Sequence, residues 1–134
     1  MEAARDFARA NHHAVLATTR TDGSPQLSPV TVAVDGDGRF VVSSRETAFK
    51  VKNLRRQSTA SLCVFTERFF GEWIQVDGST EIVSLPEAMD LLVEYYRSVS
   101  GEHPDWDDYR AAMVRDQRVI IALTAERVGP NRAG

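Results

Sequence analysis

The chain has a single cysteine and no long apolar run. Because Cys63 has no possible partner within the 134 residues, an internal disulfide is excluded and a reducing, cytoplasmic setting is expected. No apolar stretch reaches the roughly 18 residues that a membrane-spanning helix needs. Residues 1–7 also lack the apolar core of a secretory signal. We therefore expect a cytoplasmic protein with no membrane partner, in which Cys63 is a small buried apolar residue rather than a nucleophile.

An excess of positive charge and the common catalytic motifs are absent too. The formal net charge is −3, so no overall positive field exists to attract nucleic acid. The sequence has no CxxC or HExxH spacing for a metal, no GxGxxG or Walker loop for a nucleotide, and no Ser-His-Asp set in a supporting context. We therefore predict no metal site, no nucleic-acid partner and no catalytic side chain.

The composition is that of an ordinary globular protein, with 43% hydrophobic and 26% charged residues, and the length suits a single domain over residues 1–134. Alternating apolar residues and turn signals such as Asp22-Gly23 predict strands. We expect six of them, over residues 13–19, 26–34, 39–43, 59–65, 73–83 and 118–124. Short helices are expected near residues 2–11, up to 56, from 86 and over 106–113. The pattern indicates a mainly β (α+β) protein, a small six-stranded antiparallel barrel with flanking helices.

The most informative segment is residues 43–56, SSRETAFKVKNLRR. The hydroxyl residues Ser43 and Ser44 stand where a helix is expected to begin, and cations crowd the turns that follow. A helix N-terminus offers free N–H groups and the positive end of a dipole, so it favours anions. Lys50 and Asn53 are three residues apart and are expected to share a helix face. The segment therefore predicts a site for one phosphate group.

Other residues carry a functional and a structural interpretation side by side. Lys52, Arg55 and Arg56 either contact a phosphate or an acidic cofactor tail, or form a solvated helix face. Pro29 within a strand marks a sheet edge or a bulge, where backbone amides can face a ligand. Phe70 and Trp73 either wall a substrate pocket or belong to the core.

Three segments resemble the split-barrel flavin and deazaflavin oxidoreductases, the family related to pyridoxamine 5'-phosphate oxidase. They are residues 14–30, residues 50–56 with the strand that follows, and residues 96–114, so the resemblance covers nearly the whole chain. The last segment, which includes GEHPDWDDYR, resembles the actinobacterial branch that uses the deazaflavin coenzyme F420 rather than FMN.

The resemblance implies a homodimer of split barrels with two cofactor sites at the interface. It also implies that Lys50 and Asn53 hold the cofactor phosphate, with the ring along the strand that contains Ser28, Pro29 and Val30. Close relatives often carry an arginine two residues before the lysine. This chain has Ala48 there, and Arg45 is expected to supply the cation.

The implied function is hydride transfer from reduced F420 to an unsaturated or quinone-like small molecule. The cofactor carries the hydride, so the protein need only bind, orient and exclude water, which fits the missing acid–base constellation. Two alternatives stay open. One is an FMN-binding oxidoreductase on the same fold, and the other is a protein that binds or carries F420 without turnover.

Overall fold

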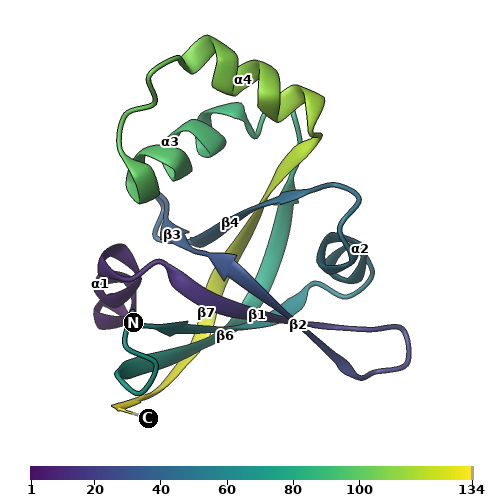
Figure 1. The fold of residues 1–134 in the computed structure, drawn as a ribbon. Coiled ribbons are helices and arrows are strands. Elements are labelled where there is room, and N and C mark those ends of the chain that lie inside the picture. The colour runs from purple at the N-terminus through teal and green to yellow at the C-terminus, as the bar shows by residue number, and fades with distance from the viewer. Residues whose placement is uncertain (134) are drawn as a thin grey trace.

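A computed structural model describes residues 1–133 of the chain (Figure 1). Four helices and seven strands follow one another along the sequence. In chain order they are α1 (Glu2–Ala10), β1 (His13–Thr19), β2 (Pro25–Thr31), β3 (Ala33–Val34), β4 (Phe40–Arg45), α2 (Phe49–Arg56), β5 (Thr59–Phe65), β6 (Glu72–Val83), α3 (Met89–Ser100), α4 (Trp106–Arg115) and β7 (Arg118–Ala133). None of the helices in the described part is long and apolar enough to cross a membrane.

All the strands join one antiparallel sheet in the order β2-β1-β5-β6-β7-β4-β3. The predicted antiparallel split barrel with flanking helices is confirmed, with seven strands in place of six. The extra strand arises because the segment predicted as one strand, residues 26–34, breaks at Val32, whose N–H donates to the His12 carbonyl at 2.8 Å. Pro29 lies in β2, an edge strand, as its missing N–H requires.

The sheet curls around a core built from one face of each long strand (Figure 1). In β1 and β5 every second residue is buried, and these side chains meet those of β6 and β7. Helices α1 and α2 contribute Ala4, Ala8, Val51 and Leu54 to the same cluster, which places α2 against the inside of the curled sheet. The strand pattern read from the sequence therefore produces this core directly.

Helices α3 and α4 cover the opposite, outer face of the sheet, but only over strands β3, β4 and β7. Leu92, Val93 and Tyr109 pack there on Val41 and Ile120 in a second buried cluster. The outer face of β2, β1 and β5 carries no helix in the described structure. The boundary between the covered and uncovered halves of this face is where the principal pocket lies.

Two expectations about element boundaries were wrong. Ser43 and Ser44 belong to β4, and α2 begins only at Phe49, with Ala48 before it and no side-chain cap. Ser43 and Ser44 extend the strand because they pair with Ile120 and Val119 of β7. The last strand was expected over residues 118–124, but β7 continues to Ala133 because it pairs along the length of β6.

Candidate functional site

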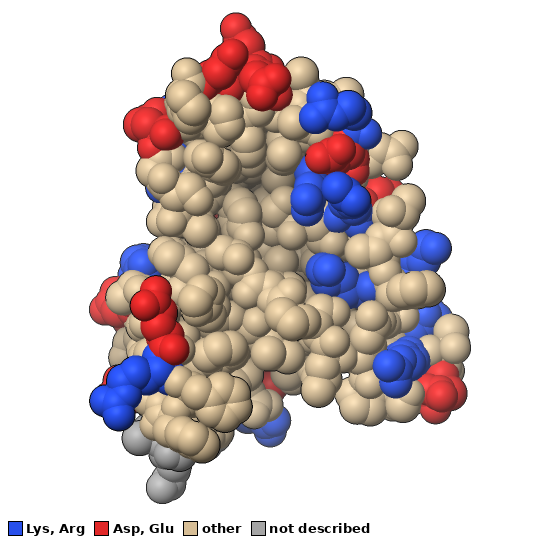
Figure 2. Space-filling view, in the orientation of Figure 1, with Lys and Arg blue, Asp and Glu red and all other residues tan. Residues whose placement is uncertain are grey.

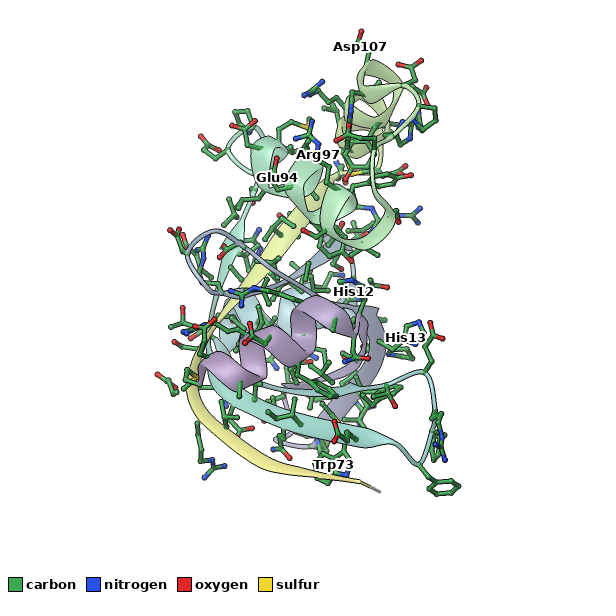
Figure 3. The ribbon with its side chains drawn as sticks, turned by 90° about the vertical axis from the view of Figure 1, so that its left-hand side faces the viewer. His12, His13, Trp73, Glu94, Arg97 and Asp107 are labelled. Atoms are coloured by element: carbon green, nitrogen blue, oxygen red, sulfur yellow. The ribbon has the colours of Figure 1, made fainter. Side chains whose placement is uncertain are left out.

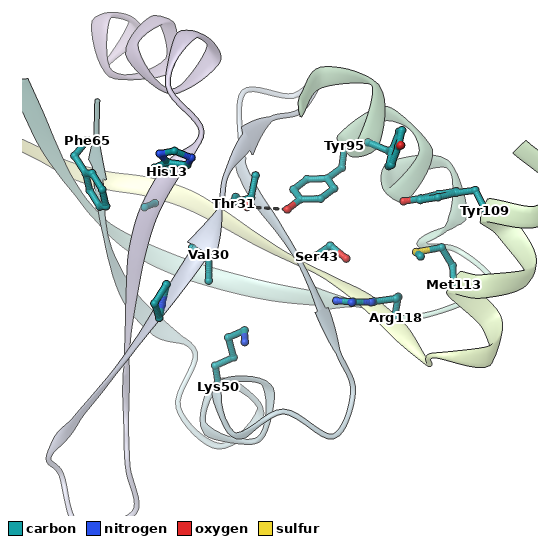
Figure 4. Close-up of a pocket in the computed structure, with 13 residues that line it drawn as sticks. His13, Val30, Thr31, Ser43, Lys50, Phe65, Tyr95, Tyr109, Met113 and Arg118 are labelled. Carbon is teal, nitrogen blue, oxygen red and sulfur yellow. Dashed lines mark hydrogen bonds between the residues drawn. The ribbon is translucent and has the colours of Figure 1, made fainter. Parts of the chain in front are cut away.

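A pocket of about 780 Å³ opens between α2, the edge strand β2 and the α3–α4 pair (Figure 4). Each of these elements contributes side chains to it, and β4 and β7 form its floor. We call it the Lys50 pocket. It is lined by His13, Ala14, Pro29, Val30, Thr31, Ser43, Lys50, Phe65, Tyr95, Tyr96, Tyr109, Met113 and Arg118.

Lys50 lies in the first turn of α2 and extends into the pocket from one side (Figure 4). Arg118, the first residue of β7, enters the same space from another side. Burial, and to a lesser degree the nearby Arg118 guanidinium, lowers the pKa of the Lys50 ammonium below its ordinary value. An anion bound beside Lys50 would oppose this lowering of its pKa.

Most of the other lining residues are apolar or aromatic, with Ser43, Thr31 and His13 as polar exceptions, and no carboxylate is among them. Figure 2 shows the same arrangement at the surface, with Lys and Arg side chains along one side of a largely uncharged central hollow. An uncompensated positive charge in a pocket with apolar walls favours an anionic ligand that has a large apolar part.

Ser43 and Ser44 have opposite orientations because they are neighbours in a strand. Ser43 lines the Lys50 pocket, whereas Ser44 is 2% exposed in the core and its hydroxyl donates to the Arg45 carbonyl at 3.4 Å. The predicted helix start at these residues is absent, and Ser44, one of the proposed cofactor contacts, faces away from the pocket.

Asn53 does not line the Lys50 pocket. It faces a second hollow of about 520 Å³, lined by Arg20, Thr21, Gln26, Phe49, Lys52, Asn53 and Arg56. Its side chain is buried, with Nδ2 donating to Gln26 Oε1 at 2.8 Å and to Thr18 Oγ1 at 3.1 Å. Asn53 therefore ties α2 to strands β1 and β2.

We expect Asn53→Ala to lower the free energy of unfolding by about 1–3 kcal/mol, because it removes two buried hydrogen bonds and leaves their acceptors without a donor. Urea denaturation of the purified protein measures this change. Gln57→Ala, an exposed change just after the same helix, is the control and should cost under about 0.5 kcal/mol. Equal stabilities for the Asn53 variant and the parent protein would contradict the structural role.

The other cations of residues 45–56 are divided among different partners. Arg55 forms a two-point contact with the Glu46 carboxylate, through Nε at 2.9 Å from Oε2 and through Nη2, and Nη2 also donates to Ser84 Oγ at 3.2 Å. Arg56 donates to the Thr19 carbonyl and to Asn53 Oδ1. Lys52 lies over the Phe49 ring. Arg45 is exposed near Asp116, with 4.0 Å between Nη2 and Oδ2.

Of the residues proposed to lie along the cofactor ring, Pro29 and Val30 line the Lys50 pocket. Ser28 is adjacent to them in β2 but is not among the lining residues. The structure therefore brings Lys50, Pro29 and Val30 together, as the proposed cofactor site requires.

Phe70 and Trp73, proposed as walls of a substrate pocket, lie elsewhere. Phe70 is 72% exposed in the turn between β5 and β6, edge-on to Phe69, and borders a separate hollow of about 890 Å³. Trp73 is half-buried in β6, far from α3 and α4 (Figure 3). Neither side chain lines the Lys50 pocket.

The sequence reasoning missed Arg118 and the tyrosines of α3 and α4. Tyr95, Tyr96 and Tyr109 form one wall of the pocket, and Arg118 lies below them (Figure 4). The helical spacing of Tyr95 and Tyr96 indicated only an apolar helix face. Arg118 was the first residue of a predicted strand, and only the pairing of β7 with β4 brings it near Lys50.

Comparisons with known proteins find the same fold in other chains. A conserved hypothetical protein from Mycobacterium tuberculosis superposes with a TM-score of 0.78 and 25% identity, over 95% of this chain and 81% of that one. An F420 reductase gives a TM-score of 0.73 and 21% identity, over 93% and 94% of the two chains. The heme storage protein from Vibrio cholerae gives 0.73 and 15%, over 99% and 95%. The last two likenesses concern the fold alone.

The sequence itself also matches a family model, the one described as pyridoxamine 5'-phosphate oxidase, over residues 1–131. The match spans every strand up to the last residues of β7, and therefore includes all the elements that surround the Lys50 pocket. Together with the split-barrel sheet, it shows that the chain belongs to the pyridoxamine 5'-phosphate oxidase family.

Proposed function

We propose that this protein is an F420-dependent reductase of the actinobacterial deazaflavin branch. The reduced cofactor would supply a hydride to an unsaturated or quinone-like small molecule. The observation that carries the proposal is the Lys50 pocket, in which two cations and no carboxylate face apolar and aromatic walls. A cytoplasmic location, which the single cysteine favours, is part of the proposal.

The residues of the pocket fit a cofactor with a planar ring and a phosphate. Lys50 would hold the phosphate as a point charge, and its partial burial strengthens the interaction because less water competes. Pro29 and Val30, on the edge strand, would contact the ring. The chain's own task is to bind, to orient and to exclude water.

The second part of the proposal is a homodimer with the cofactor sites at its interface. The uncovered outer face of β2, β1 and β5 carries Leu27, Pro29, Val15, Cys63 and Phe65, paired across the strands. Leu27 is 65% exposed. Pro29 and Phe65 also line the Lys50 pocket, so a second copy on this face would close the open side of the pocket. Sedimentation equilibrium should give about twice the chain mass of 14.9 kDa, and a monomer would refute the dimer.

Fluorescence titration of the purified protein with F420 and, separately, with FMN tests the cofactor assignment. We expect tighter binding of F420. A preference for FMN would move the protein to the flavin-dependent alternative, and binding of neither would refute both. If F420 binds, a panel of activated alkenes and quinones separates a reductase from a carrier, because a carrier would leave the reduced cofactor unoxidised with every compound.

A further inference from the structure

Arg118 is held in the Lys50 pocket by an unusual turn. Gln117, immediately before it, has a φ of 53°, a left-handed conformation that residues other than glycine seldom adopt. Two backbone hydrogen bonds hold this turn, from Gln117 N–H to the Val114 carbonyl at 3.1 Å and from Glu46 N–H to the Gln117 carbonyl at 2.9 Å. The turn ends α4 and starts β7 with the Arg118 side chain directed into the pocket (Figure 4).

The Arg118 guanidinium lacks the partners that such a group normally has. Its Nε is buried and has no hydrogen-bond partner in the described structure. No carboxylate of the described residues lies within 4.0 Å of it as an ion-pair partner. A buried donor without an acceptor is unfavourable, because it has lost its hydrogen bonds to water. An acceptor supplied by a ligand would remove this cost.

Two tyrosine hydroxyls of the wall near Arg118 are already used within the protein. The Tyr95 hydroxyl donates to the Thr31 carbonyl at 2.8 Å, and the Tyr109 hydroxyl donates to the Leu92 carbonyl at 2.9 Å. Burial, chiefly, raises the pKa of Tyr109 to about 12, so it stays neutral. These two tyrosines therefore present their rings to the pocket, and Arg118 is the charged group of this wall, with Ser43 nearby (Figure 4).

The aromatic wall is built of rings in mutual contact and suits a flat ligand. The Tyr109 ring packs at 5.0 Å from that of Tyr96 and at 5.5 Å from that of Trp106, and His103 completes the cluster. Met113 adds a polarisable side chain beside Arg118 (Figure 4). A planar, conjugated body against this wall would place a carboxylate at its end beside the guanidinium, whose planar N–H fork matches a carboxylate.

We propose that Arg118 binds a carboxylate of the substrate, and that the protein acts on small planar, conjugated carboxylic acids. The proposal rests on the proposed function for the identity of this ligand as the hydride acceptor. The proposal assigns the two cations of the pocket to different ligands. Lys50, on α2 opposite Pro29 and Val30, serves the cofactor phosphate, and Arg118, beside the tyrosines, serves the substrate.

The test compares trans-cinnamate with its neutral amide, cinnamamide, as probes. Their affinities are measured by isothermal titration calorimetry on the full chain, with and without F420. We expect the parent protein to bind the acid at least about tenfold more tightly than the amide, since a charge-assisted hydrogen bond is lost with the amide. Arg118→Met should abolish this preference and leave the affinity for the amide within about twofold. Arg118→Lys should keep part of the preference for the acid, because lysine retains the positive charge but lacks the planar N–H fork of the guanidinium.

The matched control is Lys50→Met, which should leave the preference for the acid in place and weaken F420 binding instead. An unchanged acid-to-amide ratio in Arg118→Met would overturn the proposal. Loss of F420 binding in Arg118→Met as large as in Lys50→Met would also overturn it, by assigning Arg118 to the cofactor. If the parent protein binds neither F420 nor FMN, the proposed function fails, whereas the acid-to-amide ratio without cofactor still tests Arg118. Arg118→Gln replaces Arg118→Met if the latter does not fold, as judged by circular dichroism.

Discussion

Replacing Lys50 with methionine should weaken F420 binding by about 1.5–3 kcal/mol, which is roughly 10- to 150-fold in Kd. Methionine keeps most of the aliphatic length of lysine and removes only the charge. The expected loss is large because the Lys50 ammonium is partly buried, lies in a pocket without a carboxylate and is directed at the proposed phosphate position. Fluorescence titration of both proteins with the cofactor measures the change.

Lys52→Met is the matched control for this prediction. Lys52 lies two residues further along the same helix, but it is exposed, outside the Lys50 pocket and over the Phe49 ring at 5.5 Å. An exposed charge that is screened by water should contribute under about 1 kcal/mol to binding. Equal losses in the two variants would indicate a diffuse electrostatic effect, and no loss in Lys50→Met would remove Lys50 from the phosphate site.

Gly78→Ala should destabilise the protein by about 3 kcal/mol or more, at the upper end of the cost of forcing extra atoms into a packed site. Gly78 lies at an irregularity in the pairing of β6 with β7, next to Asp77. A Cβ atom at this position would lie 2.0 Å from the Thr124 carbonyl oxygen and 2.9 Å from the Thr124 carbonyl carbon. Both atoms belong to the backbone of the paired strand, so no side-chain rotation relieves the clash and the sheet itself must shift.

Urea and thermal unfolding measure the Gly78→Ala effect, with Gly36→Ala as the control. A Cβ at Gly36 meets no atom within 4 Å, and this residue is not at a positive φ. Its replacement should therefore change the free energy of unfolding by less than about 1 kcal/mol. Similar unfolding curves for Gly78→Ala and Gly36→Ala would show that the β6–β7 irregularity tolerates a side chain.

Strand identities could be predicted from the sequence because they depend on local alternation. In β1 and β5 every second residue faces the core, and the Asp22-Gly23 turn joins β1 to β2 in the expected antiparallel register. The boundary after Phe40 could not be predicted in the same way. Ser43 and Ser44 are compatible with a helix start, and only their pairing with Ile120 and Val119 of β7 keeps them in a strand.

For the basic residues 45–56, too, the sequence predicts one part of the outcome and the fold decides the rest. Its cations are adjacent in sequence, yet Lys50 enters a pocket, Arg55 pairs with Glu46 and Arg56 contacts the Thr19 carbonyl. The sequence indicates that this segment is basic and helical. Which cation is left without a protein partner depends on the acceptors that other strands and loops bring near it.

By itself the sequence determined the family and the antiparallel barrel, because short-range patterns of residues carry both. Only the tertiary structure decided that the buried Asn53 side chain hydrogen-bonds to strands β1 and β2. It also decided that Arg118 lies in the same pocket as Lys50. Both outcomes depend on contacts between residues distant in sequence. A buried donor must find whichever acceptors the fold places beside it, and Arg118 Nε is left without one.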